Sequence, residues 1–156
     1  MSGRQPPSAA GISKFFNLGG PVYQFTEADK VWNRACGQGE CLSPRPGDSA
    51  LAALIKVHSL AMNGGVLHAL ETCSEEQLVT AAGGYRYFGL DGAASMVEAA
   101  LAELRGIQSQ GDDLRELERL EIALDERYAT HVPDDRTLTI AFERIFELRR
   151  TDFQPV

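Results

Sequence analysis

Three cysteines and a histidine are the residues whose types could bind a metal ion. Four residues separate Cys36 from Cys41, and the same gap separates His68 from Cys73. Thiolates and imidazoles are common ligands of tetrahedral zinc, so these four side chains could form a zinc site. The gap is wider than the two residues usual between paired zinc ligands, and free cysteines also pack as small hydrophobic residues. A metal or small-molecule site near Asn63–His68 and the cysteines is therefore the second hypothesis for this chain.

None of the common catalytic motifs occurs. The sequence has no Gly-x-Ser-x-Gly elbow, no His-Glu-x-x-His pair and no phosphate-binding loop that ends in Gly-Lys-Ser. The histidines His58, His68 and His131 fall on or beside expected helices, with no acidic partner evident from the sequence. His58 lies on an otherwise apolar face, which favours a hydrogen-bonded core histidine over a general base. We predict that the protein is not an enzyme and has no cofactor.

Carboxylates are concentrated in one part of the chain. The 156 residues carry a formal net charge of −7, from 22 acidic and 15 basic residues. Residues 98–135 hold eleven acids and four bases, whereas residues 1–57 hold four acids and six bases. Proteins that bind nucleic acid through its phosphates usually present a basic surface, so direct nucleic-acid binding is not expected. The acidic segment favours a basic protein partner instead.

Acids within this segment recur at helical spacing. Asp112 and Glu116 are four residues apart, and Glu118, Glu121 and Asp125 follow at spacings of three and four. Side chains three or four residues apart on a helix are neighbours, with their Cβ atoms about 5–6 Å apart. Such a row could imitate the phosphates of duplex DNA, which carries one charge per ~1.7 Å of axis.

Basic residues in the same segment support a different interpretation. Arg115 with Glu118, and Glu116 with Arg119, have the spacing of ordinary intrahelical ion pairs. If these pairs form, the segment is a solvated surface of alternating charge without a binding role.

The elements that must position these residues are helices. Thr26, with Asp29 three residues later, predicts a first helix that runs to about Ala35. A second helix begins after Asp48, and Asn63-Gly64-Gly65 should end it, because Asn and Gly tolerate the left-handed backbone of a helix C-terminus. Its inward face is expected to comprise Leu51, Leu54, Ile55, His58 and Met62.

Four or five helices follow Asn63-Gly64-Gly65. A short apolar helix covers Val66 to Leu70, and Ser74 with Gln77 forms a capping box that opens the next helix. Leu78, Val79 and Ala82 are expected on its inner face. The last three helices are expected from Asp91 to about Arg105, from Asp112-Asp113 to about Ala129, and from Asp134-Asp135 onward.

Alternation with a period of two is nowhere sustained. We therefore predict one compact all-α domain of six or seven helices over residues 23–156, packed by ridges into grooves. Residues 1–22 are interrupted by Pro and Gly and are predicted to be a flexible tail, whose Phe15-Phe16 pair could dock on the domain.

Asn63-Gly64-Gly65, with the residues around it, resembles part of a bacterial family of domains of unknown function that contains a small DNA mimic. Further points of similarity are Tyr85–Gly89, Leu124–Tyr128 and Phe153, so the resemblance extends over about residues 49–153. It implies an all-α fold and a dimer whose acidic face occupies the DNA-binding surface of a transcription factor. The acids to which that role would transfer are Asp112, Asp113, Glu116, Glu121 and Asp125.

The leading hypothesis is a non-enzymatic interaction protein that presents this acidic face to a basic partner, with DNA mimicry as its sharpest form. An immunity or accessory protein with an unknown partner would need the same surface. The odd, sparse set of cysteines, the absence of a secretory signal and the lack of an apolar run of about 18–20 residues favour the cytoplasm. A homodimer is also compatible with the resemblance.

Overall fold

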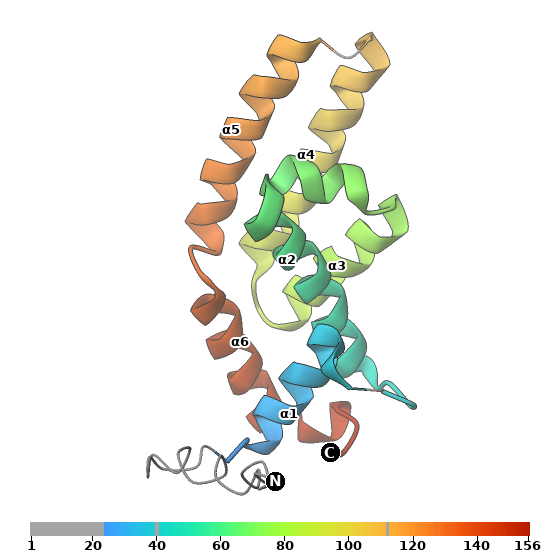
Figure 1. The fold of residues 1–156 in the computed structure, drawn as a ribbon, viewed down its shortest axis with the longest axis vertical. Coiled ribbons are helices and arrows are strands. Elements are labelled where there is room, and N and C mark those ends of the chain that lie inside the picture. The colour runs from blue at the N-terminus through green and yellow to red at the C-terminus, as the bar shows by residue number, and fades with distance from the viewer. Residues whose placement is uncertain (1–23, 40, 112) are drawn as a thin grey trace, which may run out of the picture.

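The computed structural model describes residues 24–39, 41–111 and 113–156. Six α-helices occur within these residues, together with one π-helical turn and one 3₁₀ turn (Figure 1). The α-helices are α1 (Glu27–Asn33), α2 (Pro46–Thr72), α3 (Glu75–Tyr87), α4 (Asp91–Gln110), α5 (Leu114–His131) and α6 (Asp135–Leu148). The predicted all-α domain is thus confirmed. The predicted tail, residues 1–22, lies outside the described residues.

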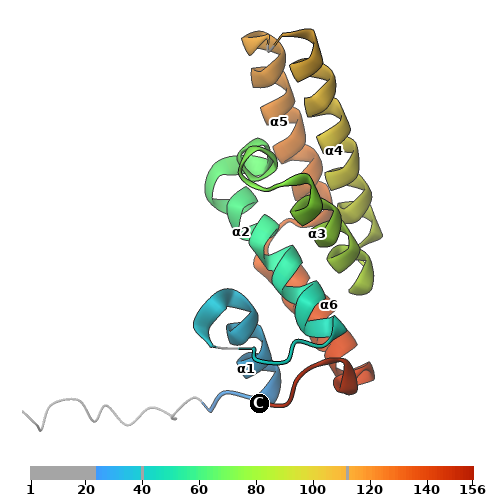
Figure 2. The same cartoon turned by 90° about the vertical axis from the view of Figure 1, so that its right-hand side faces the viewer.

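Helix α2 is the centre of the fold and is bent at Gly65, where the backbone has φ 87° and ψ 162°. That conformation is essentially restricted to glycine, because a Cβ atom would clash with the backbone. The helix continues from Val66 to Thr72 in a new direction (Figure 2). The predicted break at Asn63-Gly64-Gly65 is confirmed, and it lies at Gly65.

The inward face of α2 contains Leu51, Leu54, Ile55 and His58, as predicted. Met62 was expected there too, but it is 51% exposed, and Ala61 is the buried residue beside it. Met62 still has helical backbone, one turn before the bend, and its exposure shows that the described neighbouring helices cover Ala61 rather than this side chain.

Length and composition alone would allow α2 to cross a membrane, although its sequence shows no long uninterrupted apolar run. In this fold most of its large apolar residues lie in the core, and the helix also contains a buried aspartate and a buried histidine. Core packing is therefore a sufficient cause of its composition.

Helix α3 packs closely along α2. Its N-terminus is the predicted capping box, in which the Ser74 hydroxyl accepts the Gln77 N–H and the Gln77 side chain accepts the Ser74 N–H. At Gly84 the two helices are so close that a Cβ atom would lie 2.4 Å from the Ala50 carbonyl oxygen. Leu78 and Ala82 are buried as predicted, whereas Val79, expected inside, is 57% exposed because it lies on the outer flank of α3.

Helices α4 and α5 form an antiparallel hairpin whose connected ends project beyond α2 and α3 (Figure 1). Both helices are longer than predicted at their C-terminal ends. Asp113 caps α5 by accepting the Arg115 N–H at 2.9 Å. Leu120, Leu124 and Tyr128 of α5 are buried, and Leu117 is half-buried. Most of the acidic segment is therefore on a projecting element.

Helices α1 and α6 form the other end of the molecule together with the C-terminal residues. Asp48, at the start of α2, joins them: its buried carboxylate accepts hydrogen bonds from the Arg34 guanidinium at 2.8 Å, the Arg45 N–H at 3.0 Å and the Gln154 N–H at 2.7 Å. Arg34 also donates to the Gln154 carbonyl. The two bonds to Gln154 connect residues more than a hundred positions apart and fix the C-terminal segment.

Candidate functional site

The predicted acidic face falls on α5 and on the loop before it. Asp112 lies outside the described residues. Asp113, Glu116, Glu121 and Asp125 are all exposed. Asp113 and Asp125 also have structural roles, because each carboxylate accepts a backbone N–H. The five predicted residues are therefore not equivalent in the structure.

Asp125 caps the second half of α2 across the helix interface. The Val66 N–H, the first freed by the bend at Gly65, donates to Asp125 Oδ1 at 2.8 Å. A carboxylate at a helix N-terminus is stabilised by the free N–H groups and by the helix dipole. Asp125 thus fastens α5 to the bend in α2, and it keeps its charge at the surface.

Two contacts define the flanks of α5. Asp125 faces α2, whereas the Arg127 guanidinium faces α4, where it lies 2.8 Å from Glu103 Oε1. Glu121 and Glu118 precede Asp125 by four and seven residues, which puts all three on one flank. Glu116 lies on the other flank, because the eleven residues that separate it from Arg127 make about three helical turns. The predicted face is therefore divided between two sides of α5.

Two of the three carboxylates of α4, those of Glu98 and Glu103, are paired with arginines of neighbouring helices, whereas Asp91 makes no ion pair among the described residues. Arg86 of α3 holds Glu98 in a bidentate pair, with both N–O distances 2.6 Å. This hydrogen bonding lowers the pKa of Glu98. Glu103 pairs with Arg127 of α5, and Arg105 pairs with Glu75 of α3. The charges on α4 thus hold the hairpin to its neighbours.

None of the five acids of α5 makes an ion pair within the part of the chain that the structure describes. Asp125 accepts the Val66 N–H, and the other four are Glu116, Glu118, Glu121 and Glu126. The intrahelical pairs expected from Arg115 and Arg119 are not formed: neither arginine lies within ion-pair distance of an acid among the described residues. The two predicted intrahelical pairs are therefore absent, whereas the alternative interpretation, a solvated charged surface without a binding role, stays a prediction.

Local structure explains why Asn63, Gly64 and Gly65 occur at these positions. The Asn63 side chain donates to the Ser59 carbonyl at 2.8 Å. The ring of His68 lies directly over Gly64, where a Cβ atom would be 2.6 Å from its Cδ2 atom. Together with the bend at Gly65, these contacts account for all three residues of the motif.

The cysteines and His68 are dispersed. Cys36 is exposed, Cys73 is buried, and the Cys41 thiol donates to Gln154 Oε1 at 3.0 Å. Among the described residues, no three cysteine, histidine or carboxylate side chains are grouped as metal ligands would be. Desolvation, partial at Cys36, raises the pKa of the Cys36 and Cys73 thiols, which disfavours the thiolate that binds metal.

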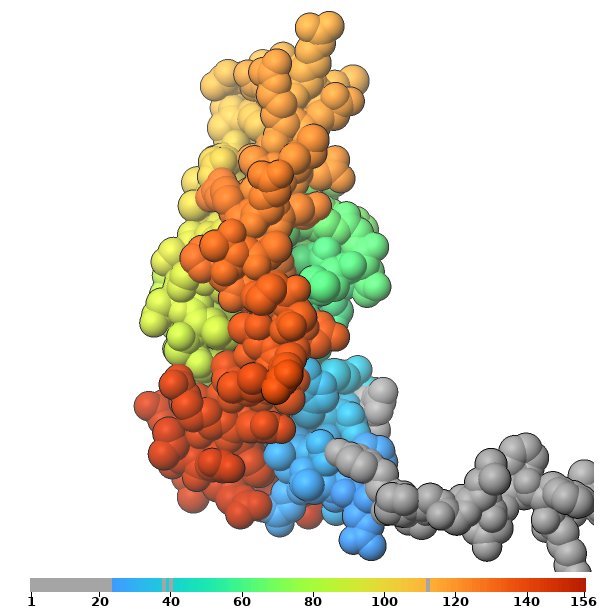
Figure 3. Space-filling model, turned by 90° about the vertical axis from the view of Figure 1, so that its left-hand side faces the viewer, coloured from blue at the N-terminus to red at the C-terminus, as the bar shows by residue number. Residues whose placement is uncertain are grey.

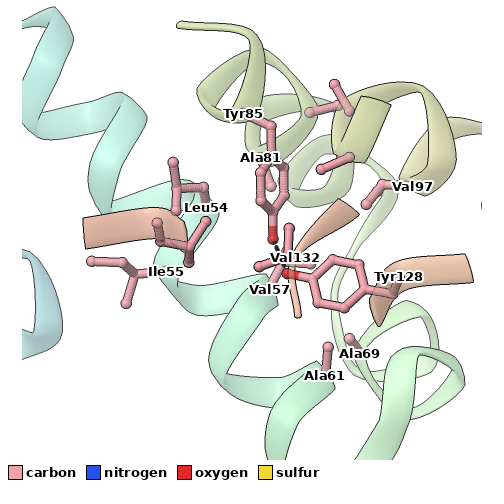
Figure 4. Close-up of a cluster of buried hydrophobic side chains, with 14 of the residues drawn as sticks. Leu54, Ile55, Val57, Ala61, Ala69, Ala81, Tyr85, Val97, Tyr128 and Val132 are labelled. Atoms are coloured by element: carbon pink, nitrogen blue, oxygen red, sulfur yellow. Dashed lines mark hydrogen bonds between the residues drawn. The ribbon is translucent and has the colours of Figure 1, made fainter. Parts of the chain in front are cut away.

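Three buried polar side chains and one exposed carboxylate, that of Asp135, form a second constellation, which the sequence did not indicate. His58 Nε2 lies 2.7 Å from Asp135 Oδ1, and His58 Nδ1 lies 2.8 Å from the Tyr128 hydroxyl. That hydroxyl is 2.7 Å from the hydroxyl of Tyr85 (Figure 4). The four side chains come from α2, α3, α5 and α6, so one hydrogen-bonded chain joins four helices.

One protonation pattern satisfies every group in this chain. The Asp135 carboxylate accepts the proton of His58 Nε2, which leaves Nδ1 to accept the Tyr128 hydroxyl proton. Tyr128 oxygen then accepts from Tyr85. Burial raises the pKa of Tyr85 to about 12 and raises that of Tyr128 further, so both phenols stay protonated and can donate. His58, predicted to be a hydrogen-bonded core histidine, is confirmed as one.

This buried chain is a structural feature rather than an active site. His58, Tyr85 and Tyr128 are each at least 95% inaccessible to solvent. None of the five cavities found on the described surface is lined by these residues or by Asp135. Both ring nitrogens of His58 already have partners, so a substrate could not reach an unoccupied base there.

Comparison with known proteins gives no independent indication of what the acidic surface does. No family model matches this chain, and neither a curated protein nor a solved structure is significantly similar to it. The resemblance to the DNA-mimic family stays a prediction.

Sequence reasoning could not have paired His58 with Asp135, because 77 residues separate them. Asp135 was recognised only as a helix-start acid. The helical spacing of Tyr128 marked it as buried, and a buried tyrosine hydroxyl requires a polar partner. That requirement was the one signal in the sequence that a buried polar chain exists.

Proposed function

We propose that this protein binds a basic protein partner through α5 and has no enzymatic activity. The observation that carries the proposal is the uneven pairing within the hairpin: Glu98 and Glu103 on α4 have arginine partners, whereas Glu116, Glu118, Glu121 and Glu126 on α5 have none. A basic surface can dock on such carboxylates without displacing an existing ion pair. Complementary charge then accelerates association and selects the partner.

DNA mimicry is the sharpest form of this proposal. Glu118, Glu121 and Asp125 lie on one flank of α5. With a rise of about 1.5 Å per residue they span about 10 Å along the helix axis, one carboxylate per ~5 Å. Each strand of DNA carries one phosphate per ~3.4 Å of axis, so the spacing is comparable. A protein that tracks a phosphate backbone with lysines and arginines would meet similar charges here.

Two matched double variants test the proposal. Glu118→Gln with Glu121→Gln removes two unpaired charges, whereas Glu98→Gln with Glu103→Gln removes two paired charges from the same hairpin. An extract of the source organism is passed over each immobilised protein, and the affinity of each retained protein is then measured. We expect the first variant to bind a basic partner about 2- to 30-fold more weakly, from two charge pairs of about 0.2–1 kcal/mol each.

Salt and competitor DNA complete the experiment. Between 50 and 500 mM salt the Debye length falls from about 14 to about 4 Å, so partner affinity should fall steeply. A duplex DNA competitor should release the same partner if the acidic flank replaces DNA. Equal binding by the wild type and by the Glu118/Glu121 variant, at both salt concentrations, would refute the proposal.

A further inference from the structure

Helices α1 and α6 lie side by side at the end of the molecule opposite the α4–α5 hairpin (Figure 3), and a groove runs between them. It consists of three adjoining cavities of about 410, 430 and 220 Å³. Glu27 and Phe146 line both the first and the second cavity, and Ala28 and Glu143 line both the second and the third. We call this feature the α1–α6 groove.

Aromatic side chains form the floor of the α1–α6 groove. The rings of Trp32 and Phe142 have their centroids 5.5 Å apart, those of Phe142 and Phe146 are 5.6 Å apart, and those of Phe146 and Phe153 are 5.2 Å apart. Trp32 is half-buried and lines the third cavity. The floor therefore suits an apolar occupant, and above all an aromatic one.

The rim of the α1–α6 groove is acidic on balance, because four acids line it against two arginines, Arg45 and Arg150. Glu143 and Glu147 line it from α6 and make no ion pair among the described residues, whereas Glu27 pairs with Arg150. An occupant with a positive charge beside its aromatic groups would match both the floor and the rim.

The chain itself contains a segment of this chemistry. Residues 1–23 lie outside the described part of the chain, and they carry two bases, Arg4 and Lys14, and no acid. Lys14 is followed directly by Phe15 and Phe16. The described chain starts two residues before Thr26, which itself lines the groove, so the segment is tethered at the groove's edge.

We propose that residues 12–18 of this same chain bind in the α1–α6 groove, with Phe15 and Phe16 on its aromatic floor and Lys14 beside Glu143 and Glu147. The eight residues from Phe16 to Gln24 can extend over about 26–29 Å, whereas α1, with seven residues, is only about 10 Å long. A short tether gives an effective concentration on the order of millimolar, so modest contacts are enough to fill the groove. The inference does not depend on the proposed function, because it concerns the opposite end of the molecule.

Trp32 provides a direct readout, because it is the one tryptophan in the chain. In the full-length protein, an occupied groove shields Trp32 from acrylamide, a fluorescence quencher. Phe15→Ser with Phe16→Ser should lower the ratio of bound to free segment at least about tenfold, since burying one Phe is itself worth that much, and quenching should rise accordingly. Pro6→Ser with Pro7→Ser, in the same segment but away from the aromatic pair, is the matched control and should leave quenching unchanged.

A charge exchange tests the assigned orientation. Lys14→Glu should lower the ratio of bound to free segment roughly two- to fivefold, the range for one exposed ion pair. Glu143→Lys with Glu147→Lys, added to the Lys14→Glu protein, should restore the shielding of Trp32, because opposite charges again face each other. Far-UV circular dichroism of each variant verifies that the helices are intact.

Two outcomes overturn the proposal. Quenching that is the same in the wild type and in the Phe15/Phe16 variant means that the segment does not occupy the groove. Shielding that disappears on dilution means that a second copy supplies the segment, which excludes binding within one chain. Shielding that is independent of concentration, lost with Phe15 and Phe16 and restored by the charge exchange, supports it.

Discussion

Tyr128 lies in the middle of the hydrogen-bond network that joins Tyr85, His58 and Asp135. It is the one residue that connects Tyr85 to His58. Its hydroxyl accepts from Tyr85 and donates to His58 Nδ1, and all three side chains are buried. Buried polar groups that lose a partner cost about 1–3 kcal/mol each, more than the hydrogen bond itself contributes. The hydrogen-bond network therefore stabilises the packing of α2, α3 and α5 only while all of its side chains are present.

We expect Tyr128→Phe to lower the free energy of unfolding by about 2–4 kcal/mol, because it leaves both His58 Nδ1 and the Tyr85 hydroxyl without a partner. Tyr85→Phe removes only the terminal donor and should cost about 1 kcal/mol. Urea unfolding followed by circular dichroism measures both values. A larger loss for Tyr85→Phe than for Tyr128→Phe would contradict the assigned direction of the hydrogen bonds.

At the scale of the element, the bend in α2 is the feature that determines how the helices meet. Gly65 supplies the backbone conformation, and Asp125 of α5 accepts the Val66 N–H that the bend exposes. A straight α2 would carry Val66, Ala69 and Leu70 away from the core in which they are buried. One glycine and one carboxylate thus couple the direction of α2 to the position of α5.

Replacing Gly65 with alanine should destabilise the protein by about 1–3 kcal/mol, because alanine is strained at φ 87°. The new methyl group would also lie 3.2 Å from Asp125 Oδ2. Gly106→Ala is the matched control: it lies within α4, with nothing within 4 Å of a new Cβ atom, and should stabilise by about 0.5–1 kcal/mol. In thermal unfolding, the melting temperature should be lower than that of the wild type for Gly65→Ala and higher for Gly106→Ala.

At the scale of the whole molecule, the charged side chains at the two ends differ in their burial and in their contribution to stability. On the projecting hairpin, the exposed acids of α5 contribute little to stability, and we propose that they bind a partner. At the other end, Asp48 and Arg34 form a buried ion pair that joins α1, α2 and the C-terminal segment. The exposed pair Arg86–Glu98 and the buried pair Arg34–Asp48 allow this contrast to be measured.

Asp48→Asn should lower the free energy of unfolding by about 3–5 kcal/mol, because it leaves the Arg34 guanidinium buried without a counter-charge. Glu98→Gln, which breaks an exposed pair, should cost no more than about 1 kcal/mol. Chemical denaturation at low and high salt separates the two effects, because salt screens the exposed pair only. Comparable losses would show that the Asp48 site is effectively solvated.

Local patterns predicted the helices well, because helix formation depends on neighbours in sequence. The capping residues Thr26, Ser74, Asp113 and Asp134 all lie where the structure has them. Errors in burial occurred at Met62 and Val79, where a bend and an outer flank changed which face is covered. The acidic segment could be located from the sequence, but its division between two flanks of α5 could not.

The sequence by itself determined the all-α class, the break in α2 and the concentration of acids near α5, because each follows from residue types at short spacing. The tertiary structure alone decided which acids have partners, and hence that the unpaired ones lie on α5. It also joined His58 to Asp135 and brought α1 beside α6 to form the groove. These features depend on contacts between residues far apart in the chain, and short-range spacing carries no information about such contacts.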